Sequence, residues 1–305
     1  MVIKLLKLGR QGMFSNANHV IDQLHLAHMN NYAFVIDWSE SCYKEKSIPG
    51  SPWNYYFYNC FDVEAMNDLN GIELLDTTCL KSDNIITPRP LGKADDELLL
   101  PTNRILANNY IVMYLRLKKN LLKIIDEFKQ DHFEGYIIGL HLRGEGKDDG
   151  GTDKYNSKLT LKNGVPFDTY FSQVDKKLKE IPNSKIFLYS YSQMVIEECE
   201  KKYGPKIITY NSSRSYYGEM HNKNEISTTR NRGYNFSPYK LGEDVLVEAY
   251  LLSYTDFLIH GISNVTNFVL CNNPSLEHTF VYENIKINYK RTPFFVNFLK
   301  RIFHI

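Results

Sequence analysis

Hydrophobic and polar residues along the first forty positions predict a strand, a helix and a second strand. Residues 2–8 have the pattern of a strand, and a glycine-bounded loop begins at Gly9. Apolar side chains then recur at helical spacing from Asn16 onward, and Ser15 or Asn16 is the expected helix cap. Residues 32–37 form a short apolar strand. This order is a βαβ unit, the building block of a parallel sheet.

The pattern after residue 93 predicts helical structure as far as residue 129, with 102–128 as its longest stretch. Apolar residues recur near one face of this stretch, with lysines between them, as in an amphipathic helix. The residues expected near this apolar face are Ile105, Tyr110, Met113, Leu117, Leu121, Ile124 and Ile125. Residues 39–62, which precede it, are rich in aromatic side chains and predict an irregular region.

A second series of strands and helices follows, and it predicts a second α/β unit with the boundary near residues 128–135. The strands are expected at 136–142, 184–190, 206–210 and 256–260. The helices are expected at 168–178, 193–203 and 243–254, with one more after Ser263-Asn264.

Composition narrows the class of protein. A chain of 305 residues is long enough for two domains, and 43% hydrophobic with 23% charged residues is typical of a soluble globular protein. The net charge of +1 gives no support for nucleic-acid binding. Five cysteines without a CxxC pair favour a reducing compartment, so we expect a cytoplasmic protein without a disulfide framework. No apolar run is long enough to span a bilayer.

The segment 136–153 carries the strongest chemical signal. His141 and Arg143 stand two residues apart at the carboxyl end of a predicted buried strand, on the same face. A loop with four glycines, four acids and Lys147 follows. Ligands of open α/β sheets bind beyond the carboxyl ends of strands, and a guanidinium there suits a phosphate. The plainer alternative is a strand that ends in a solvated, charged turn.

A second candidate site lies in residues 242–264. Glu248 lies beside the apolar stripe of the predicted helix. Its carboxylate can accept two hydrogen bonds from a planar base such as guanine. Ser263 or Asn264 is expected to cap the following helix, whose N-terminus is then an anion site. Each residue alone can be explained as a helix cap or a surface acid. Together with Arg143, they favour a pocket for a nucleoside diphosphate.

These motifs resemble the GDP-fucose-dependent fucosyltransferases. The resemblance rests on Gly139 to Arg143 with the acidic glycine loop, on Leu246 to Leu258, and on Ser263-Asn264. It is nearest to the α-1,6-fucosyltransferases, including the nodulation enzymes, and more distant from the α-1,2 and protein O-fucosyltransferases. The Gly9 loop with Phe14 to Asn18, and the stretch from Asp37 to Phe57, are also similar to bacterial and viral members.

The resemblance implies an α/β fold of the GT-B type, with two Rossmann-like domains facing across a cleft. Residues 1–130 would form the acceptor-side domain, and residues 131–291 would bind the nucleotide sugar. Residues 292–305 carry a proline followed by phenylalanines, leucine and isoleucine beside Lys300 and Arg301. This segment is expected to be a helix that packs back across the domains or lies at the inner face of a membrane.

The resemblance also implies roles for individual residues. Arg143 would contact the diphosphate and His141 would line the nucleotide pocket. Glu248 would recognise guanine, and Ser263 with Asn264 would hold phosphate. Gly9 and Asn16, in the N-terminal loop, are expected to join the donor site. The chain departs from the family at Gly144, where many members have a second arginine, and in the loop that follows.

The reaction implied is an inverting transfer of fucose from GDP-fucose to a hydroxyl of a glycan acceptor. Arg143 and Lys147 would stabilise the departing diphosphate, and a carboxylate would accept the proton of the acceptor. Asp149 is the first candidate for this base, followed by Asp148 and Glu145, and Asp153 is also within reach. No metal is expected, although Asp148-Asp149 leaves a divalent-ion site as an alternative.

Two other functions fit the same residues. The pocket can hold another nucleotide sugar, or the chain can be a non-catalytic glycan-binding protein that keeps the fold. In the second case the aromatic stretch from Trp53 to Phe61 would stack on sugars, and its plainer reading is an ordinary packed segment.

Overall fold

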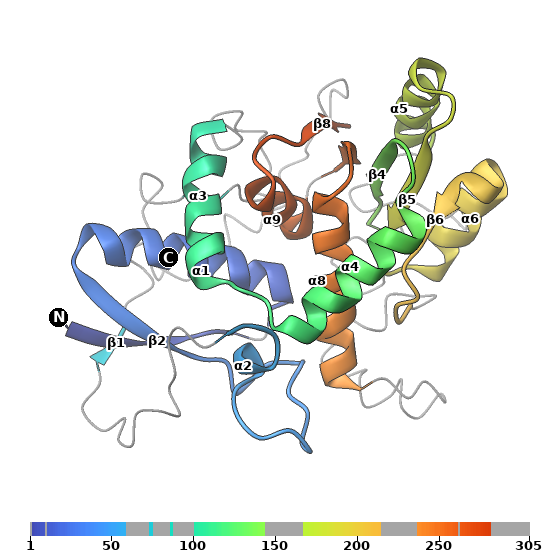
Figure 1. Ribbon diagram of the computed structural model, residues 1–305. Coiled ribbons are helices and arrows are strands. Elements are labelled where there is room, and N and C mark those ends of the chain that lie inside the picture. The colour runs from blue at the N-terminus through green and yellow to red at the C-terminus, as the bar shows by residue number, and fades with distance from the viewer. Residues whose placement is uncertain are drawn as a thin grey trace, which may run out of the picture.

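A computed structural model of the chain describes residues 2–9, 11–58, 73–75, 86–87, 101–143, 167–214, 237–261 and 263–281. These residues form an α/β fold with two separate sheets in which every strand pairing is parallel (Figure 1). The first sheet has three strands and belongs to the N-terminal part of the chain. The second has five strands and is built from residues beyond 136.

The first sheet confirms the predicted βαβ unit. Its strands are β1 (Val2–Lys7), β2 (Tyr32–Asp37) and β3 (Glu73–Leu74), in the order β2-β1-β3. Helix α1 (Met13–Met29) connects β1 to β2 and buries most of its apolar side chains. The two strands pair in parallel along their whole length, so the end of β1 and the start of α1 lie at the carboxyl edge of the sheet.

Helix α1 begins earlier than the sequence predicts, so the expected cap was wrong. Gly12 is the N-cap residue, and Asn16 lies inside the first turn. The Asn16 side chain instead donates from Nδ2 to the carbonyl oxygens of Gly9 at 3.2 Å and of Gln11 at 2.8 Å. Asn16 therefore fixes the loop that precedes the helix, because its amide satisfies two backbone carbonyls there.

The second sheet has the strand order β6-β5-β4-β7-β8. The strands are β4 (Ile137–His141), β5 (Lys185–Tyr189), β6 (Ile207–Ile208), β7 (Phe257–His260) and β8 (Glu277–Phe280). Strand β4 is central and all five of its residues are buried. The chain runs outward from β4 to β5 and β6, and then returns to the other side of β4. The strand order therefore reverses between β4 and β7, and ligands of such sheets bind at this switch point.

Helices cover both faces of this sheet. They are α5 (Phe167–Glu180), α6 (Gln193–Tyr203), α8 (Pro238–Ser253) and α9 (Asn264–Asn272), with the short 3-10 helix η5 (Gly204–Lys206) after α6. Helix α8 begins five residues before the predicted start. Ser237 is its N-cap and accepts a hydrogen bond from the Lys240 amide at 3.3 Å, and Pro238 occupies the first turn.

The long helix predicted at 102–128 is interrupted. The structure has α3 (Pro101–Tyr114) and α4 (Lys119–His132), joined by four non-helical residues. These four residues pair with the chain that follows α2 (Pro52–Tyr56): the Tyr58 amide donates to the Arg116 carbonyl at 2.8 Å, and the Lys118 amide donates to the Tyr56 carbonyl at 2.9 Å. The backbone groups that a continuous helix would use are taken by this distant partner.

The break also changes which side chains are buried. Leu117, Leu121 and Ile125 lie in the core as predicted, but Ile105 and Met113 were expected near the same apolar face and are each 54% exposed. The four residues between the helices turn α4 relative to α3, so one apolar stripe cannot continue across both helices.

Helix α9 joins the two parts of the molecule. It packs against α1, α3 and α8 (Figure 1). The centroid of the Phe268 ring on α9 lies 4.6 Å from that of Phe14 and 5.6 Å from that of Tyr250. The boundary predicted between residues 130 and 131 falls inside α4, which packs on α8. The division into domains 1–130 and 131–291 therefore stays a prediction. Residues 292–305 lie outside the described part of the chain.

Candidate functional site

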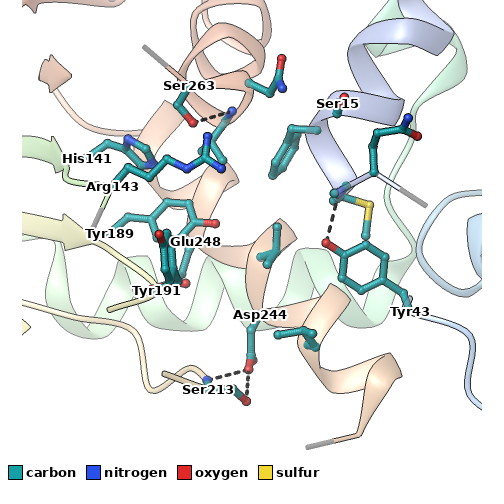
Figure 2. A pocket seen from close by; sticks show the side chains of 18 of the residues that line it. Ser15, Tyr43, His141, Arg143, Tyr189, Tyr191, Ser213, Asp244, Glu248 and Ser263 are labelled. Atoms are coloured by element: carbon teal, nitrogen blue, oxygen red, sulfur yellow. Dashed lines mark hydrogen bonds between the residues drawn. The ribbon is translucent and has the colours of Figure 1, made fainter. Parts of the chain in front are cut away.

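A cavity of about 250 Å³ lies where the carboxyl end of β4 meets the N-terminal part of the chain. One wall comes from the start of α1 and from Tyr43, and the others come from β4, β5, α8 and the turn before α9. Figure 2 shows Tyr43 and Ser15 on one side of this space and His141 and Arg143 on the other. Both halves of the chain therefore contribute to one site.

Arg143 and His141 are brought to the cavity by β4, as the sequence predicts. The Leu142 amide still donates to the Tyr189 carbonyl at 3.2 Å, so the strand continues almost to the arginine. His141 is buried and its ring meets Tyr189 edge-on at 5.2 Å. Burial and the nearby positive charge of Arg143 lower the pKa of His141 to about 3, so its imidazole is neutral at pH 7.

The turn before α9 lines the same cavity as Arg143. Ser263 is the N-cap of α9, as predicted, and its Oγ accepts from the Val265 amide at 3.2 Å. Asn264 follows it, and the Asn264 carbonyl accepts from Asn18 Nδ2 on α1 at 3.1 Å. Figure 2 shows Ser263 and Arg143 on the same side of the cavity, opposite Ser15 and Tyr43. An N-terminal helix end and a guanidinium together make this part of the cavity positive.

Glu248 lies at another part of the cavity and is almost fully buried, with 1% of its surface exposed. Its Oε1 atom accepts from Arg214 Nη2 at 2.6 Å, and the same nitrogen donates to the Tyr210 carbonyl at 2.9 Å. Burial raises the pKa of Glu248 to about 7, and Arg214 opposes that rise. The carboxylate was expected to offer both oxygens to a ligand, but Arg214 already occupies one.

Asp244 is a second acid in this part of the cavity, and the sequence reading missed it. It precedes Glu248 by one helical turn on α8, so the two side chains lie on the same face of the helix. Asp244 Oδ2 accepts from the Ser213 amide at 2.9 Å and from the Ser213 hydroxyl at 3.1 Å (Figure 2). Lys240 pairs with Asp244 Oδ1 at 2.8 Å. The spacing of four residues was a signal available in the sequence.

The N-terminal wall is held by Tyr43, whose hydroxyl accepts from the Met13 amide at 3.1 Å (Figure 2). Gly9 and Asn16, which were expected in the donor site, are not among the described residues that line the cavity. The Gly9 carbonyl is used inside the loop, where it accepts from Asn16 Nδ2 at 3.2 Å and from Trp38 Nε1 at 3.1 Å. The two residues thus shape the loop next to the cavity.

The remaining predicted site residues, Glu145, Lys147, Asp148 and Asp149, lie outside the described part of the chain. Among the residues that the structure does describe, no three His, Cys, Asp or Glu side chains gather in a way that would hold a metal ion. The helices described here include none that is both long enough and apolar enough to cross a membrane.

Positive and acidic groups lie at different parts of the cavity. Arg143 and the capped N-terminus of α9 provide positive charge at one part, whereas Glu248 and Asp244 provide acceptors at another. A ligand that fits this arrangement has an anionic group and, at a distance from it, a group that donates hydrogen bonds. The neutral imidazole of His141 and the ring of Tyr189 lie beside the positive part and present flat surfaces.

The class of fold is that of the GT-B fucosyltransferases. POFUT1 in complex with GDP matches this structure with a TM-score of 0.50 over 92% of this chain and 98% of that chain, at 10% sequence identity. NodZ alpha-1,6-fucosyltransferase co-crystallized with GDP matches with a TM-score of 0.49 over 88% and 92% of the two chains, at 16% identity. A mutant of Arabidopsis thaliana FUT1 in complex with GDP gives 0.49 over 91% and 70%, at 11% identity.

The likeness is one of structure. No protein-family model and no curated protein matches the sequence. At these identities the comparisons show the fold and leave the substrate open. The match to POFUT1 agrees with the α/β architecture that the sequence predicts, and the structure has parallel sheets in both halves of the chain.

Proposed function

We propose that this protein is an inverting, metal-independent glycosyltransferase that transfers fucose from GDP-fucose to a hydroxyl of a glycan acceptor. The observation that carries the proposal is the shared cavity. Arg143 and the Ser263 cap stand at one part of it, and the buried acids of α8 stand at another. A nucleoside diphosphate has the matching chemistry, with anionic phosphates and a base that donates hydrogen bonds.

The positive part of the cavity suits the diphosphate. The guanidinium of Arg143 offers a fixed fork of donors, and the first turn of α9 offers backbone amides with a favourable dipole. The solved structures of similar fold include NodZ soaked with GDP-fucose and POFUT1 in complex with GDP-fucose. Negative charge grows on the departing diphosphate during transfer, and one preorganised donor stabilises such charge by about 3 kcal/mol.

The acidic part of the cavity suits guanine. The Glu248 oxygen that Arg214 does not hold accepts from the N1–H of the base, and the charge of Arg214 favours the ionised form of this carboxylate. The pair therefore presents an acceptor that a purine with an N1–H group satisfies. A base without such a donor leaves a buried carboxylate oxygen unpaired, which is costly.

The reaction that we propose breaks the bond between the anomeric carbon and the diphosphate oxygen and forms a bond from that carbon to the acceptor oxygen. The acceptor proton passes to a carboxylate, for which we propose Asp149 first, then Asp148 and Glu145. The leaving group departs as GDP, with its charge balanced by Arg143, the α9 N-terminus and Lys147. Attack from the face opposite the leaving group inverts the anomeric configuration.

We propose the same division of the chain that the sequence predicts. The N-terminal domain, 1–130, carries the acceptor side, and residues 131–291 carry the donor side. The protein acts in the cytoplasm on a nucleotide sugar and a glycan acceptor.

Nucleotide-induced thermal shift and donor hydrolysis test the proposal together. We expect GDP and GDP-fucose to raise the melting temperature, and UDP to have no effect. Arg143→Ala is expected to lower GDP affinity by about two orders of magnitude, since it removes a charge-assisted contact to the diphosphate. Lys201→Ala, on the exposed face of α6, is the matched control and should bind GDP normally. A preference for UDP would show that GDP-fucose is not the donor. The absence of any nucleotide binding would show that the protein is not a glycosyltransferase.

A further inference from the structure

The junction of α3 and α4 exposes an unusual number of large apolar side chains. Nine such side chains are exposed among the described residues, and five of them lie on α3, on α4 or on the segment that pairs with their junction. Val112 is 62% exposed and Leu122 is 39% exposed, and the other three are Tyr58, Ile105 and Met113. We call these five residues, together with Arg116, Lys118 and Lys119, the α3–α4 face.

Three of the apolar residues of this face, Tyr58, Val112 and Leu122, border a groove. Its volume is about 660 Å³, and its walls come from α3, α4, the four residues between them and Tyr250 of α8. Ile111, Leu115 and Leu117 line its buried side, whereas Val112 and Leu122 stand at its exposed side. Exposed apolar side chains that gather around a groove in this way favour contact with another body.

The charge of the face has one sign. Residues 98–125 contain five cations and no acid, in a chain whose net charge is only +1. Arg104 is buried, and Lys123 pairs with Glu127 at 3.6 Å. Arg116, Lys118 and Lys119 have no carboxylate within ion-pair distance among the described residues, and Arg116 lies over the Tyr58 ring at 5.9 Å. These three cations are thus available to an anionic partner.

We propose that the α3–α4 face docks on the surface of an anionic lipid membrane. Apolar side chains that project between lysines and arginine are the composition of an interfacial contact, in which the apolar groups enter the acyl boundary and the cations meet headgroups. A second copy of this chain is a poorer partner. A two-fold interface would bring the same three cations of both copies together without acids between them.

This inference stands apart from the proposed function, because none of the residues of the face lines the cavity that holds Arg143 and Glu248. It also concerns a different part of the chain from residues 292–305. The membrane contact predicted from the sequence was placed on that terminal segment, whereas the described structure supports one on α3 and α4.

Vesicle co-sedimentation of the full chain tests the proposal. One set of vesicles is phosphatidylcholine alone, and the other contains about one quarter phosphatidylglycerol, with salt varied from about 50 to 300 mM. We expect binding to the anionic vesicles that weakens with salt. Arg116→Gln with Lys119→Gln should lower the partition coefficient about 25-fold, because each cation near an anionic surface contributes roughly fivefold. Val112→Ser with Met113→Ser should lower it roughly tenfold.

Two matched controls keep the result interpretable. Met29→Ser changes an equally exposed apolar residue at the end of α1, and Lys201→Gln removes a cation from α6. Both are expected to bind vesicles like the unaltered protein, and all variants should keep its melting temperature. The proposal is wrong if the unaltered chain does not bind anionic vesicles. It is also wrong if the α3–α4 variants bind as well as the unaltered chain, because another segment would then make the contact. The proposal is also wrong if the Val112→Ser, Met113→Ser variant has half the molar mass of the unaltered protein in solution, because the face would then be a dimer interface.

Discussion

Arg214 donates a hydrogen bond of 2.6 Å to Glu248 inside the cavity, and both side chains are largely buried. The pair joins two segments that are 34 residues apart in the sequence. Burial raises the pKa of Glu248 to about 7, so the positive charge of Arg214 has a direct effect on how much of the carboxylate is ionised at neutral pH. Arg214 engages Oε1, so a ligand that pairs with this carboxylate without displacing Arg214 would use Oε2.

The first prediction concerns the 2-amino group of the base. Inosine diphosphate keeps the N1–H of GDP and lacks this amine. Because Arg214 holds one Glu248 oxygen, we expect the two nucleotides to bind within about threefold of each other. Arg214→Ala frees the second oxygen, and GDP should then gain roughly a fivefold preference, the value of one ordinary hydrogen bond. Isothermal titration of both nucleotides measures this. A strong preference for GDP in the unaltered protein would show that Arg214 leaves Glu248 on binding.

The second prediction separates the structural role of Ser263 from its role at the anion site. Ser263→Ala removes the N-cap of α9 and should lower the free energy of unfolding by about 1 kcal/mol. Ser263→Asp restores a cap, so its stability should return close to the original. The aspartate, however, places negative charge where a phosphate would bind, and GDP affinity should fall below that of Ser263→Ala. Urea unfolding and GDP titration on both variants check this. Equal GDP affinity in the two would contradict a phosphate at this turn.

The third prediction is a loss of stability in acid. Burial lowers the pKa of His141 and of His260 to about 3, and that of His278 to about 4, from an ordinary value of 6.5. His260 and His278 share a hydrogen bond of 3.0 Å. As the pH falls, the unfolded chain binds protons at these histidines before the folded protein does. The contribution of the neutral histidines to the free energy of unfolding is therefore complete above about pH 6.5 and is lost as the pH falls toward 4.

At about pH 5, each fully buried histidine should destabilise the fold by roughly 2 kcal/mol relative to pH 7.5. Urea unfolding across this range measures the slope. In His260→Gln the stability at pH 7.5 is expected to drop, but the slope between pH 7.5 and 5 should become shallower because one proton fewer is taken up. An unchanged slope would show that His260 does not stay neutral in the folded protein.

The fourth prediction concerns the contact between α2 and α8. The Tyr56 hydroxyl lies so close to Gly242 that a side chain at this glycine would collide with it, and the same hydroxyl donates to the Tyr239 carbonyl at 2.9 Å. Gly242→Ala should therefore cost roughly 1–3 kcal/mol through overpacking. The cost should shrink in a Tyr56→Leu background, which a double-mutant cycle by thermal unfolding would measure. Additive effects would rule out the close contact.

Most of the strands and helices on both sheets were predicted because each has a clear local pattern. The helix at residues 193–203 and the strand at 32–37 have the predicted bounds. The break between α3 and α4 was missed because residues 115–118 contain no glycine or proline. Their conformation is set by pairing with Tyr56 and Tyr58, which are some sixty positions away in the sequence. No local pattern encodes such a partner.

Some residues of the candidate site were predicted from the sequence, and others were not. Arg143, His141 and Ser263 were found because each stands at the end of a strand or the start of a helix, and such ends are visible in the sequence. Arg214 was missed because it follows a short strand in a segment without periodicity, so only the fold reveals its contact with Glu248. The start of α8 was missed although Ser237-Pro238 is an ordinary helix-start signal.

Helix α9 has a mechanical consequence. Its first residues carry the proposed phosphate turn, while its sides pack on α1 and α3 from one half of the chain and on α8 from the other. A rigid-body rotation of one half of the chain relative to the other would separate α9 from buried neighbours such as Phe14 or Tyr250. We therefore expect ligands to enter by local rearrangement, with the spacing between the cavity walls set by the packing of α9.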